Sequence, residues 1–209
     1  MARIFLIRHG ETSANSEKRY QGQIDTPLNS TGLRQAKELA KTLLKVPFKR
    51  FYASHLRRAV ETAQAIAGPR HQPIKRIPEL CERNFGAWEN LTFLEIKKLY
   101  PKIYKEWQRT PYAAIPQAEP FQKFKKRVLA GLQKIMRELN ADKNILIVAH
   151  GGTTRVILHY FLGLDERKNF WKVKQDNACI NIIDVEHKYH LVSLMNYHQK
   201  NLMGPSIKY

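Results

Sequence analysis

Two short runs of apolar residues, each followed by a His-Gly pair, constrain the fold of this chain more than any other feature. The first run covers residues 4–7 and leads into His9, and the second follows Asn144, covers residues 145–149 and leads into His150. A short, continuous apolar run that stops at a glycine turn is typical of a strand buried on both faces of a parallel sheet. Ligands of open α/β sheets bind outside the carboxyl ends of the strands. If the two strands are neighbours, both histidines lie at the same edge of the sheet, and we expect the chemistry there.

Strand-like and helical segments alternate along the rest of the chain. This order predicts an α/β fold, a three-layer sandwich in which a mostly parallel sheet is covered by helices on both faces. We treat residues 1–209 as a single domain, within which residues 83–120 form a small helical cap insertion. Ser54 is expected to cap a helix, and residues 197–209 are expected to form a loose tail. Predicted helices cover residues 33–44, 56–67, 92–107 with a break near Pro101, 121–139 and 152–162, and the other predicted strands cover 49–53, 74–80, 179–185 and 191–195.

The balance of charge is the unusual part of the composition. The 209 residues suffice for one well-buried domain, but the formal net charge is +18, with Lys and Arg spread over the whole chain. Such a field attracts phosphorylated metabolites, nucleic acid or acidic membranes alike, but a generally basic, solvated surface is the favoured explanation. We expect a small phosphorylated substrate and no membrane partner. Charge alone leaves nucleic acid open as a less favoured partner, and a homodimer is also left open.

Cysteine and terminal patterns bear on the cellular compartment. The two cysteines, Cys81 and Cys179, are too few for a disulfide framework and lack CxxC spacing, as in reduced cytosolic proteins. The N-terminus has no charged region followed by a long apolar stretch, and no run approaches membrane-spanning length. We therefore expect a cytoplasmic protein. The scattered His and Asp residues have no metal-ligand spacing, so we expect neither a metal nor another cofactor.

The polar residues around the two histidines are more numerous than a buried core histidine needs. His9 lies between a guanidinium at Arg8 and Gly10, which allows the backbone to approach a ligand. After His150 a predicted helix begins at once, and its free backbone N–H groups near Gly151 form an anion site. The alternative is a glycine turn that only serves strand-to-helix packing.

Two further segments carry candidate residues. Arg57 and Arg58 are adjacent at the start of a predicted helix, so one can face the site while the other faces solvent. Glu82 lies among the apolar residues of the 80–88 segment, a setting that could hold its carboxyl group protonated as a general acid. The alternative for Glu82 is a surface glutamate paired with Arg83.

Together these segments resemble the histidine phosphatase superfamily, also called phosphoglycerate mutase-like. The resemblance covers nearly the whole chain, and it rests on ordered motifs at the spacing of the family. The matching residues are Leu6-Ile7-Arg8-His9-Gly10-Glu11-Thr12, Gly22 with Asp25, Pro27-Leu28 and Gly32, Ser54-x-Leu56-x-Arg58-Ala59-x-x-Thr62-Ala63, Glu82 with Phe85-Gly86-x-Trp88-Glu89, His150-Gly151-Gly152, and Asp176-Asn177-Ala178.

The resemblance implies a phosphomonoesterase that needs no metal. His9 would be the nucleophile, and its phosphohistidine would divide one difficult transfer into two easier ones. Arg8, Arg58 and His150 would hold the phosphoryl oxygens, and Glu82 would protonate the leaving oxygen and then deprotonate the attacking water. The resemblance leaves alpha-ribazole phosphate, phosphoserine, a sugar phosphate or a broad range open as substrates. The implied substrate-binding residues are Asn15, Gln21, Gly22, Arg83 and Gly151.

Some residues depart from the family pattern. Residues 117–120 read Gln-Ala-Glu-Pro where the family often has Gly-Gly-Glu-Ser, and Asn90 replaces a common glycine. Arg83 is similar to the mutase pattern, in which this arginine helps to hold a substrate carboxylate. A cofactor-dependent phosphoglycerate mutase is thus the first alternative, opposed by the short cap without paired arginines. The second alternative is a basic anion- or nucleic-acid-binding protein on the same fold, opposed by the retention of all five implied catalytic residues.

Overall fold

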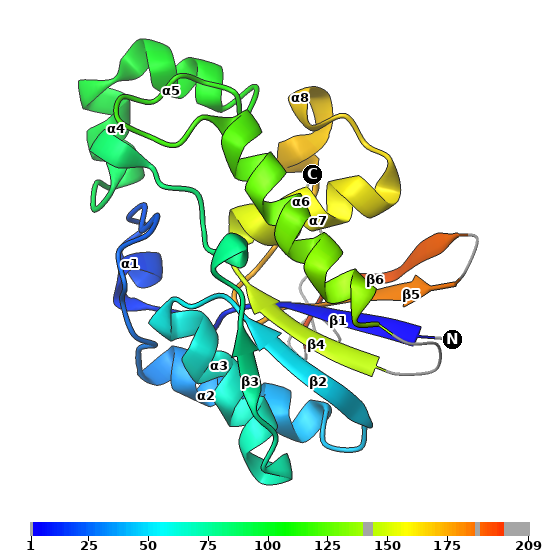
Figure 1. Ribbon diagram of the computed structural model, residues 1–209. Coiled ribbons are helices and arrows are strands. Elements are labelled where there is room, and N and C mark those ends of the chain that lie inside the picture. Colours follow the sequence, from blue (N-terminus) through cyan, green and yellow to red (C-terminus); the bar gives the residue numbers. More distant parts are fainter. Residues whose placement is uncertain (1, 140–143, 187–188, 199–209) are drawn as a thin grey trace, which may run out of the picture.

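The computed structural model describes residues 2–139, 144–186 and 189–198, and its centre is a six-stranded sheet with the strand order β3-β2-β4-β1-β5-β6 (Figure 1). Strand β1 (Ala2–Arg8) and strand β4 (Asn144–Ala149) are parallel neighbours in the middle of the sheet. Their register places Arg8 opposite Ala149, so both strands end at the same edge. The prediction that the two His-Gly strands are adjacent is confirmed.

The other strands divide into a parallel and an antiparallel part. Strand β2 (Phe48–Ala53) pairs with β4, and β3 (Ile74–Arg76) pairs with β2, both in parallel. On the other side of β1, strand β5 (Ile180–Val185) is antiparallel to β1, and β6 (His190–Tyr197) is antiparallel to β5. The predicted mostly parallel α/β sheet is therefore confirmed, with an antiparallel pair at one edge.

Helices cover both faces of the sheet, because successive side chains of each central strand point to opposite faces. Ile4 and Leu6 of β1 pack into one apolar core, and Phe5 and Ile7 pack into the other. This gives the three layers that the sequence predicts. The covering helices are α6 (Phe121–Arg137) and α7 (Gly151–Leu162) on the first face, and α2 (Ser30–Thr42) and α3 (Arg57–Ala67) on the second.

The cap, residues 83–120, stands apart from the sheet (Figure 1). It contains α4 (Phe93–Leu99) and α5 (Pro101–Trp107), so the predicted helical segment with a break at Pro101 is confirmed. The break follows from the steric clash of a proline ring with a helical conformation of the preceding residue. The cap has its own apolar cluster, centred on the buried Trp88 and Ile96.

Three local predictions differ from the structure. Only residues 74–76 of the predicted 74–80 strand pair with the sheet, because Pro78 has no N–H to donate to a ladder and begins a short 3-10 turn. Ser54 is not the N-cap of α3, since Leu56 holds that position and Ser54 donates its own backbone N–H to the sheet. Tyr197 belongs to β6, whereas most of the predicted 197–209 tail lies outside the described residues.

Several short elements complete the described parts of the chain. No helix in these parts is long and apolar enough to cross a membrane. The short elements are α1 (Ser13–Ser16), α8 (Glu166–Asn169) and the 3-10 turns Gly68–Arg70, Pro78–Leu80, Gly86–Trp88 and Phe170–Lys172.

Candidate active site

His9 and His150 lie side by side at the carboxyl ends of β1 and β4. The parallel register continues one residue past β1, where the His9 N–H donates to the carbonyl of Ala149 at 3.0 Å. The centroids of the two imidazole rings are 5.2 Å apart. Both side chains are buried, with 3% and 0% of their surface exposed. The pairing of the two apolar strands thus brings the two histidines together, as the sequence predicts.

The hydrogen bond of His9 fixes its tautomer. Its Nδ1 lies 2.6 Å from the carbonyl oxygen of Gly10, which can only accept, so Nδ1 carries the proton and Nε2 carries the lone pair. Burial, and then the positive charges of Arg58 and Arg8, lower the pKa of His9 well below its usual range. The ring is therefore neutral near pH 7, with Nε2 available as a nucleophile.

Two arginines, Arg8, which is partly buried, and Arg58, which is buried, line the same cavity as His9. Arg8 donates from Nη1 to the carbonyl of Gln175 at 2.6 Å, and Arg58 donates to the carbonyls of Ile24 and Gly22 at 2.7 and 2.8 Å. These bonds fix each guanidinium but leave both Nε atoms, which are buried, without a partner among the described residues. Burial lowers the pKa of Arg58 to about 10, so both the positive charge and its spare donors remain at neutral pH.

His150 adds two more unpartnered polar atoms. Both of its ring nitrogens are buried and bond to no described residue. Burial, followed by the positive charge of Arg58, lowers its pKa well below the usual range. Buried polar atoms are almost always hydrogen-bonded, so four unpartnered nitrogens around two fixed cations indicate a site for an anion.

The chain segment before β5 forms hydrogen bonds with the backbone of His9. The Ala178 N–H donates to the carbonyl of His9 at 3.0 Å, and the Asn177 amide donates to the same carbonyl at 3.3 Å. On the other side, the Gly10 N–H donates to the hydroxyl of Thr62 in α3 at 3.0 Å. The Asp-Asn-Ala and Thr-Ala motifs of the sequence therefore serve to hold the His9 backbone.

Asn15, Gln21 and Gly22 line the same cavity as His9. The side-chain oxygen of Asn15 accepts from Thr12, and its amide nitrogen donates to no described residue, which leaves a neutral donor for a ligand. The side-chain oxygen of Gln21 accepts from the Thr12 hydroxyl at 2.9 Å. Gly22 has a φ of 54°, and a Cβ there would lie 1.9 Å from a carboxylate oxygen of Glu89, so only glycine fits.

Glu82 lines the cavity as well, but its surroundings differ from the prediction. Its two carboxylate oxygens accept from the backbone N–H groups of Arg83 and Gly152, each at 2.9 Å. The apolar residues near Glu82 in the sequence therefore do not describe its whole setting, because the carboxylate also has backbone N–H partners at Arg83 and at the start of α7. The N-terminus of α7 thus holds Glu82 at Gly152, while Gly151 packs against the guanidinium of Arg8.

Arg83 is buried within the cap, and its guanidinium, unlike its backbone N–H, makes no hydrogen bond with the Glu82 carboxylate among the described contacts. Its guanidinium donates to the carbonyls of Glu119 and Pro111, both at 2.7 Å, and lies 5.4 Å from the ring centre of Trp107. Burial lowers its pKa to about 10. The surface ion pair considered for Glu82 is absent from the described residues, and Arg83 lines the cavity as expected of a substrate-binding residue.

The cavity has a volume of about 280 Å³ and combines the cationic floor with an aromatic wall. The sequence analysis missed Arg155, which donates to the carbonyl of Val173 at 2.8 Å and lies 5.5 Å from the ring centre of Trp171. Helical spacing could have indicated it, since Arg155 follows Gly151 by four residues on α7 and so lies on the same face of the helix.

Within the described residues, no group of three or more His, Cys, Asp and Glu side chains could hold a metal ion. The aromatic lining residues are Tyr20, Phe85, Phe93, Trp107, Phe121, Phe124, Phe170 and Trp171.

The lowered pKa values of the two histidines predict a loss of stability in acid. Both rings are neutral when folded and become protonated on unfolding, so their contribution is complete above the unfolded pKa of about 6.5 and is lost as the pH falls below it. When the pH falls from about 7.5 to about 5.5, each buried histidine should lower the free energy of unfolding by up to about 1.4 kcal/mol. Thermal unfolding at both pH values should show a smaller acid loss for His150→Gln than for wild type.

The control for this measurement is His71→Asn, since the His71 side chain is exposed and asparagine tolerates its positive φ. This variant should lose as much stability in acid as wild type does. The same loss in His150→Gln would contradict the assignment of a neutral buried imidazole.

Comparisons with known proteins agree with this geometry. The model of the histidine phosphatase superfamily (branch 1) matches residues 4–198. The chain is 33% identical over 195 residues to the adenosylcobalamin/alpha-ribazole phosphatase of Escherichia coli K12, covering 93% of this chain and 95% of the relative. Among solved structures, the alpha-ribazole phosphatase of Shigella flexneri superposes with a TM-score of 0.84 at 32% identity, covering 93% of this chain and 96% of that one. A phosphoserine phosphatase mutant from Entamoeba histolytica in complex with phosphoserine superposes with a TM-score of 0.83 at 28% identity, covering 95% and 98%.

Proposed function

The chain belongs to the histidine phosphatase superfamily and is a phosphoric monoester hydrolase, and from this premise we propose that it hydrolyses a small phosphorylated metabolite through a phosphohistidine on His9. The observation that carries the proposal is the set of buried, unpartnered nitrogens around the lone pair of His9. A phosphoryl group on His9 would accept hydrogen bonds from Arg8 and Arg58, and its charge would be stabilised at fixed donors.

In the first step, Nε2 of His9 attacks the phosphorus atom and a P–N bond forms as the P–O bond to the leaving group breaks. Glu82, in its protonated form, gives its proton to the leaving oxygen. The position of Glu82 in the same cavity as His9 supports this role. The hydrogen bond from Nδ1 to Gly10 keeps the imidazole in the tautomer that attack requires, and it stabilises the positive ring that attack produces.

In the second step, water hydrolyses the phosphohistidine. The carboxylate of Glu82 takes a proton from the water, the water oxygen forms a bond to phosphorus, and the P–N bond breaks with its electrons returning to Nε2. Inorganic phosphate leaves, and Glu82 is again protonated for the next cycle. One carboxyl group thus serves as acid and as base, because the leaving oxygen and the attacking water approach the phosphorus from the same side.

The shape of the cavity supports a small leaving group with an apolar or flat part. The cavity of about 280 Å³ is lined by aromatic rings both from the cap, such as Trp107, and from the core, such as Phe124 and Trp171. The relatives include enzymes named for alpha-ribazole phosphate and for phosphoserine. We place alpha-ribazole phosphate first among the candidates, because stacking of its aromatic base on such rings would add binding energy. Phosphoserine and sugar phosphates follow.

Hydrolysis of p-nitrophenyl phosphate is expected to be unchanged, within about twofold, in excess EDTA, because arginines supply the positive charge that a metal supplies elsewhere. Phosphate release is then measured for alpha-ribazole phosphate, phosphoserine and sugar phosphates. An activity that EDTA abolishes and added Mg²⁺ restores would contradict the mechanism.

The same protein preparation tests the mutase alternative, which Arg83 favours because it lines the cavity with a positive charge. Interconversion of the phosphoglycerates is assayed with a bisphosphate primer. We expect phosphate release to exceed exchange, and exchange without release would instead identify a mutase.

We also propose that the enzyme works in the cytoplasm. Cys81 and Cys179 are both free and buried, which suits a reducing compartment. Fractionation of cells that produce the tagged protein checks this proposal, and recovery outside the cytoplasmic fraction would contradict it.

A further inference from the structure

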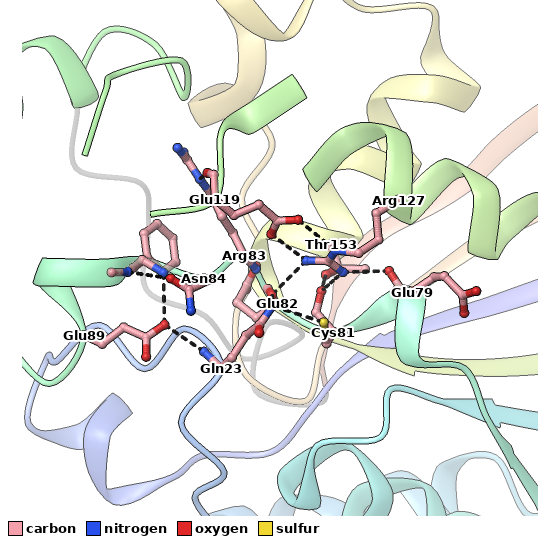
Figure 2. A network of polar contacts seen from close by, with 12 residues as sticks. Gln23, Glu79, Cys81, Glu82, Arg83, Asn84, Glu89, Glu119, Arg127 and Thr153 are labelled. Atoms are coloured by element: carbon pink, nitrogen blue, oxygen red, sulfur yellow. Dashed lines mark hydrogen bonds and ion pairs between the residues drawn. The ribbon is translucent and has the colours of Figure 1, made fainter. Parts of the chain in front are cut away.

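Arg127, on α6, uses all of its hydrogen-bond donors in one network (Figure 2). Nη1 donates to the carbonyls of Glu79 and Cys81 at 2.8 and 2.9 Å, and Nη2 donates to the carbonyl of Glu82 at 3.1 Å. The remaining N–H groups of Nε and Nη2 form a fork onto the two carboxylate oxygens of Glu119 at 2.9 and 2.8 Å. A guanidinium has five N–H donors, so none is left over.

The network is largely buried and its charges are balanced. The side chains of Arg127 and Glu119 expose 20% and 11% of their surface. Burial by itself lowers the pKa of Arg127, but the hydrogen bonds and charge of Glu119 outweigh it and leave that pKa raised. The guanidinium also lies 5.1 Å from the ring centre of Phe124. Bidentate pairs of this kind in a partly buried setting hold a defined geometry, unlike an exposed ion pair.

The carbonyls that Arg127 holds belong to the segment that carries the general acid. Two further side chains bond to the same carbonyls: the amide of Gln23 donates to the carbonyl of Glu82 at 3.0 Å, and the hydroxyl of Thr153 donates to that of Cys81 at 3.1 Å. The backbone of Glu82 is therefore held between the core helices and the loop after β1. Arg127 is the only charged side chain among these donors, and it contacts three of the four residues from 79 to 82.

Glu119 links this network to the cap. It precedes α6 at the point where the cap returns to the core, and its backbone N–H donates to the carbonyl of Asn84 at 3.0 Å. Its carbonyl accepts from the guanidinium of Arg83. Residues at the start of the cap thus bond to the backbone of Glu119 at its end, and the carboxylate of Glu119 pairs with Arg127. This gives a role to the 117–120 segment, in which the sequence departs from the family pattern but keeps its glutamate.

We propose that Arg127, paired with Glu119, is a positioning residue that sets the distance of the Glu82 carboxyl group from the leaving oxygen. The proposal rests on the proposed function, in which Glu82 is the general acid. Arg127 touches neither substrate nor phosphorus in this account. It acts through the backbone of residues 79–82, and its loss moves the acid while Arg8, His9 and Arg58 keep their places.

The test uses the leaving group as a probe of acid catalysis. An alkoxide needs a proton to leave, whereas p-nitrophenolate leaves well without one, so a displaced acid harms alkyl phosphates far more. Arg127→Gln should lower kcat/KM by about 10- to 100-fold for the best alkyl phosphate substrate and by less than about 3-fold for p-nitrophenyl phosphate. Arg127→Lys, which can reach some of the carbonyls but cannot fork onto Glu119, should be intermediate.

The matched control is Lys134→Gln. Lys134 is on the same helix and pairs with the side chain of Glu79, but it donates to none of the carbonyls of residues 79–82 among the described contacts. The kcat/KM of this variant should equal that of wild type for both substrates. Thermal unfolding is measured for all variants, and Arg127→Lys replaces Arg127→Gln if the latter does not fold.

Glu82→Gln separates the proposal from its premise. Glu82→Gln should show a strong dependence on the leaving group, and adding Arg127→Gln to it should lower alkyl phosphate turnover by less than about 3-fold more. Suppose that Glu82→Gln shows this dependence. If Arg127→Gln then lowers kcat/KM equally for both substrates, or for neither, the positioning role is overturned while the acid assignment stands. If Glu82→Gln itself shows no dependence on the leaving group, the acid assignment and the positioning role both fall.

Discussion

His9→Ala is expected to lower kcat/KM for p-nitrophenyl phosphate by about 10⁴-fold or more, because the variant has no group that can form the covalent intermediate. Its neighbours do not replace it. Both ring nitrogens of His150 are buried, and His9 is the one histidine among the described residues that lines the cavity. The variant should fold, since a smaller side chain at this position leaves the strand pairing through Ala149 and Ala178 unchanged. Steady-state kinetics at neutral pH give the measurement.

A second readout distinguishes lost chemistry from lost structure. Rapid mixing of wild type with labelled substrate, followed by quenching in alkali, should trap label on the protein, because phosphohistidine survives alkali and not acid. His9→Ala should trap none, whereas His55→Ala, which changes an exposed histidine, should trap as much as wild type. Full activity in His9→Ala would show that another residue accepts the phosphoryl group.

Arg58→Ala is expected to lower kcat/KM by about 10³-fold, the second largest effect of a single substitution. Removal of one preorganised donor at a site of developing charge costs about 10²- to 10³-fold, and Arg58 also lowers the pKa of His9 that keeps the nucleophile neutral. Its two bonds to the carbonyls of Gly22 and Ile24 are lost as well, which loosens the loop that lines the cavity. The inhibition constant of inorganic phosphate should rise, since product and transition state share this contact.

The adjacent arginine supplies a matched control. The Arg57 side chain is 61% exposed and pairs with Glu61 at 2.7 Å, one helical turn along α3. Such a pair contributes only about 0.3–0.5 kcal/mol to stability, and it lies outside the cavity. Arg57→Ala should therefore change kcat/KM by less than about 2-fold. Equal losses in the two variants would mean that net charge, rather than a placed donor, accounts for the effect.

The layers of the fold could be predicted because they depend on local periodicity. Apolar runs that are continuous, such as residues 145–149, indicate strands covered on both faces, and the heptad-like apolar spacing of α6 indicates a helix with one buried face. The direction of β5 and β6 could not be read in this way. Parallel and antiparallel edge strands have similar patterns, and only the packing of the whole sheet decides between them.

The residues of the site divide in the same manner. His9 and His150 could be placed because each directly follows a strand whose partner was evident. The contacts of Glu82 could not, since its carboxylate accepts from Gly152, 70 residues away in the chain. Arg127 reads as an ordinary charged residue on an amphipathic helix, yet it bonds to a carbonyl 45 residues away. Contacts of this kind depend on how the cap returns to the core, which no local pattern encodes.

The place of β1 in the sheet has a consequence for the order in which the site is built during protein synthesis. This strand is made first, but both of its neighbours, β4 and β5, lie more than 130 residues later in the chain. The groups that hold the His9 carbonyl come from Asn177 and Ala178. A nascent chain whose residues 144–185 have not yet left the ribosome therefore carries its nucleophile on an unpaired, apolar strand. Catalytic competence and the burial of that strand arrive together, late in translation, so partly made chains carry the strand exposed and without the chemistry.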